Sequence, residues 1–285
     1  MQRLEERLTA ASGVYYDADR LLASHQSPYQ RIEIFETPDL GRLMRIDGAN
    51  MTSDRDEFFY HEALVHPAAC AHPAPQRALI VGGGDGGSSE EALKHPSVAL
   101  CRMCELDQAV VDMAREWLPQ VHNGVFSDAR LRVQIGDGMA YLANPDREAS
   151  DCFDLIYLDL TDPVGPAEAL YAPPFFADCK RALNAGGALT LHIGSPFSHP
   201  QRVQQSLRHL RQLFSVVTPY FVHIPIYGAT WGFAVASDAI DVSQVAAEEI
   251  DARLASRQVA HRQLYTGAVH HAMLTLPPYV QGLAL

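Results

Sequence analysis

The sequence predicts an α/β protein in which a small antiparallel β unit precedes a doubly wound, mostly parallel sheet. Three observations favour this fold class. The first 60 residues alternate polar and apolar side chains, later apolar runs alternate with helical segments, and a glycine-rich turn follows the first of those runs. A β-α-β-α order indicates parallel strands, because each helix carries the chain back to the starting edge of the sheet.

The N-terminal segment has the pattern of half-buried strands joined by turns. Residues 29–36 alternate polar and apolar side chains, residues 37–41 have turn chemistry, and residues 42–46 form the expected returning strand. We therefore expect an N-terminal domain of β-strands and hairpins at residues 1–60.

Residues 61–285 have the pattern of a Rossmann-like domain of the class I methyltransferase type. Short apolar runs predict strands at residues 78–81, 98–104, 131–135, 153–158 and 188–193. The segments between them predict helices at residues 88–95, 108–118, 175–183 and 201–213, with Ser88 and Glu91 at the spacing of a capping box. Two further strands, at residues 216–224 and 231–236, lack an intervening helix and should form an antiparallel edge hairpin. The last 45 residues are expected to form a helix and a tail.

The composition is acidic and excludes several classes of function. The 285 residues include 22 Lys and Arg against 34 Asp and Glu, which gives a formal charge of −12. Nucleic acids and anionic membranes require clustered positive charge, so neither is an expected partner. A P-loop sequence is also absent, which excludes that class of nucleotide hydrolase. Cationic and neutral small molecules remain as candidate ligands.

The cysteines indicate a reducing environment. Their number, five, is odd and their spacing is irregular, which predicts a cytoplasmic protein without a disulfide framework. Cys101 and Cys104 form a C-x-x-C sequence, but strand residues three apart point to opposite faces, so we expect buried thiols. We see no signal peptide, and no apolar run approaches the roughly 20 residues of a membrane-spanning helix.

A glycine-rich loop, Gly82-Gly-Gly84-Asp-Gly-Gly87, follows the first apolar strand and opens a helix. Glu105 lies 23 residues after Gly82, at the end of the next strand. The glycines permit close approach of the backbone to a ligand, and the acid can accept hydrogen bonds from ribose hydroxyls. This context fits an NAD site and an S-adenosyl site equally well.

The negative charge of Asp85, inside the loop, distinguishes between these two candidate ligands. A pyrophosphate binds at a helix N-terminus through backbone N–H groups and the helix dipole, and a carboxylate there would repel it. The carboxylate would also repel the α-carboxylate of S-adenosylmethionine but would attract a cationic amine. Decarboxylated S-adenosylmethionine, with its sulfonium and free aminopropyl amine, fits this charge pattern. Asp137, between Gly136 and Gly138, can accept a hydrogen bond from the adenine amino group.

Two more acids, Asp159 and Asp162, follow the fourth strand of the predicted sheet. Ligands of open α/β sheets bind beyond the carboxyl ends of the strands, so both acids are expected to face the ligand opposite Asp85. The alternative is a turn role, because Asp-Pro is typical of turns.

Six motifs in order resemble the polyamine aminopropyltransferases, the family that includes spermidine synthase, over nearly the whole chain. They are Tyr29-Gln30, the segment from Asp56 to Glu62, the glycine loop, Glu105-Leu-Asp107, Gly136-Asp-Gly138 and the segment from Asp159 to Pro166. The resemblance implies transfer of an aminopropyl group from decarboxylated S-adenosylmethionine to a polyamine, with release of methylthioadenosine. It also implies that no metal is needed, and that the chain forms a homodimer or homotetramer through its N-terminal region.

The resemblance also implies a role for each matching residue. Asp159 is the implied catalytic proton acceptor. The positions implied for the amine are Tyr60, His61, Asp85, Asp162, His192 and Tyr227. The positions implied for the methylthioadenosine part are Gln30, Gly82, Gly84, Glu105, Asp137, Gly138 and Pro166.

Some residues depart from the usual pattern of that family. His192 stands where a Gln commonly lines the acceptor pocket, and Glu90 stands where Arg is usual. The segment 224–233 is closer to thermospermine-synthase-like members. Putrescine, giving spermidine, is therefore the default acceptor, and spermidine, giving spermine or thermospermine, is the second choice. Cadaverine and agmatine stay open as acceptors.

Three other functions are compatible with the fold. A methyltransferase that uses S-adenosylmethionine on a small molecule is the first alternative, and Asp85 with the strand-end acids argues against it. A non-catalytic homologue that binds a nucleoside or polyamine is the second, and the presence of both Asp159 and Asp162 argues against it. An NAD-dependent oxidoreductase is the third.

Overall fold

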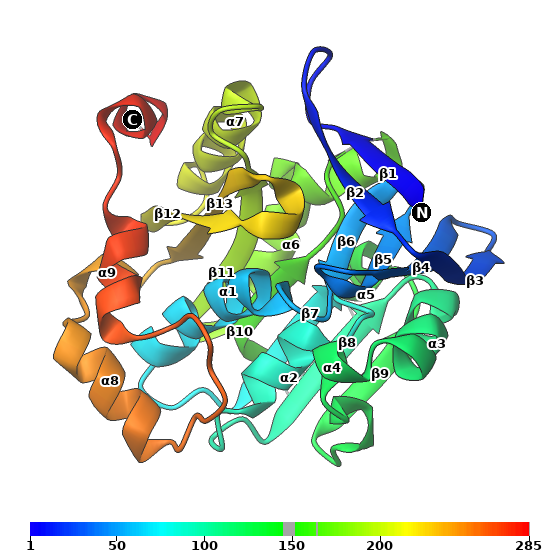
Figure 1. Ribbon diagram of the computed structural model, residues 1–285. Coiled ribbons are helices and arrows are strands. Elements are labelled where there is room, and N and C mark those ends of the chain that lie inside the picture. The colour runs from blue at the N-terminus through cyan, green and yellow to red at the C-terminus, as the bar shows by residue number, and fades with distance from the viewer. Residues whose placement is uncertain (145–151, 164, 285) are drawn as a thin grey trace.

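A seven-stranded sheet forms the centre of the molecule (Figure 1). The computed structural model describes residues 1–144, 152–163 and 165–284. The strand order is β12-β13-β11-β10-β7-β8-β9; the five strands from β11 to β9 are parallel, and β12 and β13 are antiparallel to their neighbours. The strands are β7 (Arg77–Gly82), β8 (Leu100–Glu105), β9 (Leu131–Ile135), β10 (Phe153–Asp159), β11 (Leu183–Gly194), β12 (Val216–Ile224) and β13 (Ala229–Ser237). The predicted doubly wound sheet and edge hairpin are confirmed.

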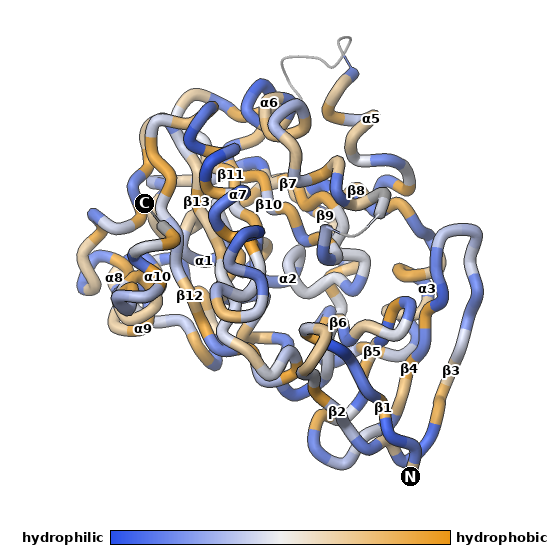
Figure 2. Tube along the Cα trace, turned by 90° about the horizontal axis from the view of Figure 1, so that it is seen from above, coloured by the Kyte–Doolittle hydropathy of each residue, from blue (hydrophilic) through white to orange (hydrophobic). Residues whose placement is uncertain are grey.

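The central position of β10 follows from its sequence. Leu155 and Tyr157 point into one apolar core, Ile156 and Leu158 point into the other, and all four are buried. A strand that is apolar on both faces can be stable only where helices cover both sides of the sheet. Figure 2 shows apolar residues concentrated in these central strands.

Helices cover the sheet on both faces. One core joins the sheet to α1 (Glu57–Ala71), α2 (Gly87–Leu93), α8 (Ala247–Ser256) and α9 (Gly267–Leu274). The opposite core joins it to α5 (Gly138–Ala143), α6 (Pro173–Ala182), α7 (Pro200–Arg211) and α10 (Pro278–Ala284). The last three helices of the described chain thus replace the single helix and tail expected from the sequence.

The N-terminal segment forms two antiparallel units beside the sheet. The first is the hairpin of β1 (Gln2–Arg7) and β2 (Gly13–Ala18), and the second is the sheet of β3 (Arg20–Gln26), β4 (Arg31–Thr37), β5 (Gly41–Ile46) and β6 (Ala49–Ser53). Ile32, Ile34 and Met44 of this sheet pack against α3 (Gln108–Trp117) and α4 (Pro119–His122). The predicted strand pair is therefore present as β4 and β5, which fold back on each other at Thr37 and Gly41.

The capping box predicted for α2 is wrong. Within the described structure, α2 has no side-chain cap, and it begins after Gly86, which has a φ of 90°. The Ser88 hydroxyl instead donates a hydrogen bond to Asp159, 2.7 Å away, while Glu91 pairs with His66 and Lys94. A buried carboxylate on a neighbouring strand thus competes with the helix backbone for the serine.

The two thiols of the C-x-x-C sequence are buried, as predicted. The five cysteines, all within the described residues, form no disulfide. Cys101 and Cys104 lie on β8 and are buried in the two opposite cores. Burial raises the pKa of both thiols to about 12, so neither is a reactive thiolate at neutral pH.

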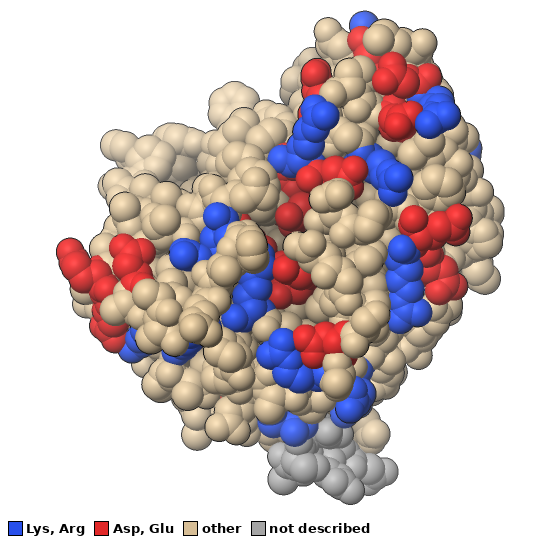
Figure 3. Space-filling view, turned by 60° about the horizontal axis from the view of Figure 1, so that its bottom comes forward, with Lys and Arg blue, Asp and Glu red and all other residues tan. Residues whose placement is uncertain are grey.

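The surface carries both signs of charge. Figure 3 shows basic and acidic side chains interspersed over one face, so the excess of acids does not form one continuous patch there. Within the described part of the chain, no helix is both long enough and apolar enough to cross a membrane.

Helix α1 is held by the C-terminal part of the chain. The buried carboxylate of Glu62 accepts backbone N–H groups from Gln263, Leu264 and Tyr265 at 2.6, 3.0 and 2.6 Å. Near the other end of the helix, the Arg257 guanidinium donates to the carbonyl oxygens of Ala69, His72 and Pro73. These contacts fix the helix that carries Tyr60 and His61.

We expect Glu62→Gln to lower the free energy of unfolding by about 2–4 kcal/mol, because an amide replaces a buried carboxylate that accepts three N–H donors. Urea denaturation followed by circular dichroism measures the change. Glu36→Gln is the matched control, since Glu36 pairs with Arg20 at the surface and its loss should cost less than about 1 kcal/mol. Equal effects of the two substitutions would contradict this role of Glu62.

Candidate active site

One cavity of about 480 Å³ lies at the carboxyl ends of the parallel strands, between the N-terminal sheet and the central sheet. The wall includes the residues just before β4, residues of β5, β6 and α1, the glycine loop, and the ends of β8 and β10. Most of the positions predicted from the sequence line it: Gln30, Tyr60, His61, Gly82, Gly84, Asp85, Glu105, Asp137, Gly138, Asp159 and Tyr227. Residues more than 190 positions apart in the chain therefore meet around one space.

The glycine loop brings functional side chains against the backbone. A Cβ added at Gly84 would stand 2.9 Å from the Glu105 carboxylate oxygen Oε2. A Cβ at Gly87 would stand 2.2 Å from Cε1 of His61. Neither distance is compatible with a side chain, so glycine at these two positions lets the acid and the imidazole pack against the loop.

At one end of the cavity, Glu105 and Asp107 form a connected pair. Glu105 is only 8% exposed, and its carboxylate accepts a hydrogen bond from the Asp107 backbone N–H at 2.9 Å. Burial raises the pKa of Glu105 to about 7, although hydrogen bonds from the backbone oppose the shift. Asp107 in turn accepts hydrogen bonds from Ser27, at 2.6 Å, and from Gln30, at 3.1 Å.

This pair connects the two parts of the chain. Sequence reasoning proposed Gln30 and Glu105 for the nucleoside but missed that Asp107 holds Gln30 in place. The Glu-x-Asp spacing was the available signal, since the second acid follows the strand and begins α3 as its N-cap.

Asp137 lies beside Glu105 in the same wall. One of its carboxylate oxygens caps α5 by accepting the Met139 N–H at 2.8 Å. Gly138 packs closely on Val81, since a Cβ there would stand 2.6 Å from that side chain. Asp137 therefore caps α5 and also lies in the cavity wall, as the sequence predicted for a ligand-binding residue.

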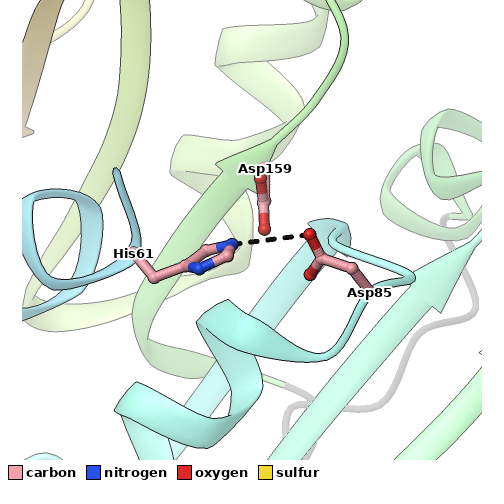
Figure 4. A group of neighbouring side chains, drawn as sticks. All are labelled: His61, Asp85 and Asp159. Atoms are coloured by element: carbon pink, nitrogen blue, oxygen red, sulfur yellow. Dashed lines mark ion pairs between the residues drawn. The ribbon is translucent and has the colours of Figure 1, made fainter. Parts of the chain in front are cut away.

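At the other end of the cavity, His61, Asp85 and Asp159 point toward one another (Figure 4). His61 comes from α1, Asp85 from the glycine loop and Asp159 from the end of β10. The His61 Nε2 atom lies 3.5 Å from Asp85 Oδ2, and its Nδ1 atom lies 2.7 Å from Oε2 of Glu57. The cluster thus has three carboxylates around one buried imidazole.

The burial and the mutual charges shift the pKa of each group. Burial disfavours a charged His61, but Asp85 and then Glu57 outweigh it and raise the pKa of the imidazole well above its ordinary value. Burial and the negative charge of Asp85 raise the pKa of Asp159 to about 6, although His61 and Ser88 oppose the shift. Burial acts to raise the pKa of Asp85, but the charge of His61, its hydrogen bond and the Gly87 N–H together outweigh burial and lower that pKa.

Asp159 has a defined orientation between polar and aromatic groups. The Ser88 hydroxyl donates to its Oδ2 atom, an interaction that sequence reasoning could not find because the two residues are 71 positions apart. The Tyr60 and Tyr227 rings lie 6.2 Å apart at nearly right angles in the adjoining wall. The buried Tyr60 hydroxyl acts on the pKa of Asp159 through hydrogen bonding, which places it close to that carboxylate.

Two predicted residues lie outside the cavity wall. After β10 the chain turns, and the Asp162 carboxylate pairs with Arg202 of α7 at 2.8 Å instead of facing Asp85. His192 is buried behind the wall, where its Nε2 atom lies 2.9 Å from the Leu160 carbonyl oxygen and 2.6 Å from the Tyr171 hydroxyl. The side chain of Pro166, the remaining predicted position, lies outside the described residues.

The cluster also has the spacing of a cation site. Donor atoms of His61, Asp85 and Asp159 lie within 4.8 Å of one another. Because the raised pKa of His61 keeps a proton on the ring, an imidazolium supplies positive charge to the carboxylates without a metal ion. The geometry can therefore bind cationic groups and accept a proton at Asp159.

Comparison with known proteins defines the class. The sequence profile of the spermine/spermidine synthase domain matches residues 57–246, and that of the spermidine synthase tetramerisation domain matches residues 4–54. A polyamine aminopropyltransferase of Nitrosomonas europaea is 49% identical over 278 residues, which are 98% of this chain and 84% of the relative. Polyamine aminopropyltransferase 1 of Pseudomonas aeruginosa is 37% identical over 281 residues, covering 98% and 96% of the two chains.

Solved structures agree with these relatives. A spermidine synthase in complex with the transition-state analogue AdoDATO has a TM-score of 0.91 and 33% identity, with 99% of this chain and 94% of that chain covered. The Thermotoga maritima spermidine synthase has a TM-score of 0.88, 32% identity and the same coverage. The chain belongs to the spermine/spermidine synthase family. It is an enzyme of the aminopropyltransferase type, and its co-substrate is decarboxylated S-adenosylmethionine.

Proposed function

We propose that this enzyme binds the methylthioadenosine part of its co-substrate at Glu105, Asp137 and Gln30, and transfers the aminopropyl group at Asp159. The observation that carries the proposal is the position of Asp159, which lies in the same cavity wall as Glu105 and is surrounded by His61, Asp85 and Ser88. A nucleoside-binding end and a proton-accepting end are thereby separated within one cavity.

The reaction is an in-line displacement at a carbon atom. The neutral amine attacks the γ-carbon of the aminopropyl group, the C–S bond breaks, and the electron pair of that bond converts the sulfonium to the thioether of methylthioadenosine. The attacking nitrogen then carries an extra proton, which Asp159 accepts. An alkyl ammonium has a pKa near 10.4, so keeping the amine neutral at pH 7 costs about 4.6 kcal/mol.

The charges around the cavity favour the decarboxylated co-substrate. Asp85, Glu57 and Asp159 lie close to the place where the amine of the aminopropyl group would bind. The carboxylate of intact S-adenosylmethionine would be repelled there, whereas a primary ammonium would be attracted. This argument and the family assignment both disfavour a methyltransferase, a non-catalytic binder and an NAD-dependent oxidoreductase.

Putrescine is our proposed acceptor, and spermidine is the second candidate. The pairing of Asp162 with Arg202 bears on this choice, because an acid that is already neutralised by a guanidinium attracts a distal ammonium less strongly. Because Arg202 neutralises Asp162, the site offers fewer free carboxylates to a second or third ammonium group. This favours a short diamine over a triamine.

A panel of acceptors tests this proposal directly. The enzyme is incubated with decarboxylated S-adenosylmethionine and, separately, with putrescine, cadaverine, agmatine, spermidine and spermine, and the products are identified by mass. We expect the highest kcat/KM for putrescine, by at least about tenfold. A preference for spermidine, with spermine or thermospermine as product, would contradict the assignment of the acceptor but not that of the reaction.

We also propose a cytoplasmic homodimer or homotetramer, supported by the free cysteines and by the match of residues 4–54 to a tetramerisation domain. Light scattering coupled to size exclusion is expected to give two or four times the 31.3 kDa of one chain. A monomer at micromolar concentration would contradict the proposed assembly.

A further inference from the structure

Glu57 is a partly buried acid of the site that takes no part in the displacement or the proton transfer described above. It stands in the first turn of α1, one turn before His61, and its Oε2 atom lies 2.7 Å from the His61 Nδ1 atom. The two side chains are 12% and 2% exposed. At this distance and burial, the pair is a charge-assisted hydrogen bond rather than a solvated surface contact.

The surroundings of His61 determine its charge. From α1 it faces Glu57 and, edge-on at 5.5 Å, the Tyr60 ring; from the glycine loop it faces Asp85 and the backbone of Gly87; from β10 it faces Asp159. Beyond these groups, Glu91 acts on Glu57 and His122 acts on Asp85. Every charged group in direct reach of the ring is thus a carboxylate.

Both ring nitrogens of His61 point at carboxylates, Nδ1 at Glu57 and Nε2 at Asp85. A neutral imidazole carries only one N–H, so it would leave one carboxylate facing a lone pair. An imidazolium has an N–H for each, and the pKa of His61, raised by Asp85 and Glu57 against the effect of burial, agrees with this state.

We propose that Glu57 is a positioning residue that acts through His61: its carboxylate holds the imidazole as a cation beside Asp85, and this cation keeps the attacking amine at Asp159 in its neutral, nucleophilic form. The inference rests on the proposed aminopropyl transfer. It assigns to Glu57 no contact with the substrate and no proton transfer.

The cation resolves an electrostatic conflict in the site. Three carboxylates, Glu57, Asp85 and Asp159, would by themselves stabilise an incoming amine as the unreactive ammonium. The single positive charge of His61, placed between Glu57 and Asp85, offsets one of the three negative charges and disfavours a second positive charge on the attacking nitrogen. During transfer, the amine proton passes to Asp159, the C–N bond forms as the C–S bond breaks, and His61 keeps both of its protons.

Substitution of Glu57 by Gln tests the role. Glutamine keeps the size of the side chain and an oxygen that can accept the Nδ1–H, but it removes the negative charge. We expect the pKa of His61 to fall in this variant, towards the ordinary imidazole value, because Glu57 no longer helps Asp85 to stabilise the imidazolium. The measured quantity is kcat/KM for putrescine in the variant divided by kcat/KM in the wild type. The amine titrates in the same way in both assays, so its own pH dependence does not affect this ratio.

That ratio is expected to lie within about threefold of one at pH 6 and to fall at least tenfold between pH 6 and pH 8.5. Glu62→Gln is the control, because it makes the same change five residues further along α1, at a carboxylate that binds the C-terminal segment: it should lower stability while giving a ratio that does not change with pH. A flat ratio for Glu57→Gln would show a merely structural role and overturn the proposal.

Nitrogen NMR of the ring of His61 in the wild-type enzyme, assigned by comparison with His61→Asn, gives a second test that does not depend on the variant folding. We expect both ring nitrogens to be protonated at pH 7.5. A neutral ring at that pH would overturn the proposal. If the wild-type enzyme released no methylthioadenosine while the ring was doubly protonated, the proposed function would fail and the Glu57–His61 pairing would stand.

Discussion

Replacing Asp159 by Asn is expected to lower kcat by about 10²–10⁴-fold, because it removes the group that we propose accepts the proton of the attacking amine. Asparagine has the same shape and can still accept the hydrogen bond from Ser88 through its amide oxygen. Glu105 and Asp137, the residues proposed to bind the nucleoside, also line the cavity and are unchanged by the substitution. The affinity for methylthioadenosine should therefore stay within about threefold of the wild type.

Single-turnover kinetics with saturating decarboxylated S-adenosylmethionine, together with calorimetric titration of methylthioadenosine, measures both quantities. Loss of methylthioadenosine binding with unchanged turnover per bound complex would contradict the role of Asp159. The same kinetics in the wild type should show activity falling as the pH drops through about 6, where Asp159 becomes protonated.

The Asp159→Asn enzyme is also expected to be more stable than the wild type above pH 6. The pKa of Asp159 rises from an ordinary 3.8 to about 6 on folding, so the folded state binds the proton more tightly and the ionised carboxylate destabilises it. The difference corresponds to at most about 3 kcal/mol above pH 6 and disappears below about pH 4. Thermal unfolding at pH 8 and pH 4 measures it, and equal transitions for both enzymes at pH 8 would contradict the buried charge.

Replacing Glu105 by Gln is expected to weaken methylthioadenosine binding by about 10–100-fold, because hydrogen bonds from ribose hydroxyls to a buried carboxylate become bonds to a neutral amide. The amide oxygen can still accept the Asp107 N–H, so the loop should keep its conformation. The value of kcat at saturating co-substrate should change less than about threefold, since the reacting carbon lies at the other end of the cavity.

The pH dependence of binding separates this role from a structural one. Burial raises the pKa of Glu105 to about 7, and donors from the ligand favour the ionised form, so methylthioadenosine should bind more tightly as the pH rises from 6 to 8. The Gln variant should lack this change. Calorimetric titration at both pH values is the measurement, and a parallel pH dependence in the two enzymes would contradict the assignment.

The sheet and most of the cavity wall could be predicted because their signals are local. The glycine loop, Glu105, Asp137 and Asp159 each follow a strand, and the carboxyl ends of parallel strands meet at one edge of a sheet. The apolar run of β10 likewise required a central position with helices on both sides.

The partners of these residues could not be predicted in the same way. Ser88 fits a capping box locally, but its hydroxyl bonds to Asp159 on a strand 71 positions away. Asp162 has the sequence of a second site acid, yet the turn after β10 directs it to Arg202. The ion pair of Glu57 with His61 could have been predicted, because side chains four residues apart lie on the same face of a helix.

The most direct test of the account is the identity of the group transferred. The enzyme is supplied with putrescine and either decarboxylated or intact S-adenosylmethionine, and all products are identified by mass. We predict one equivalent of methylthioadenosine for each spermidine formed from the decarboxylated co-substrate, and at least about 100-fold less product from the intact one. Formation of S-adenosylhomocysteine and a methylated amine from intact S-adenosylmethionine would contradict the account.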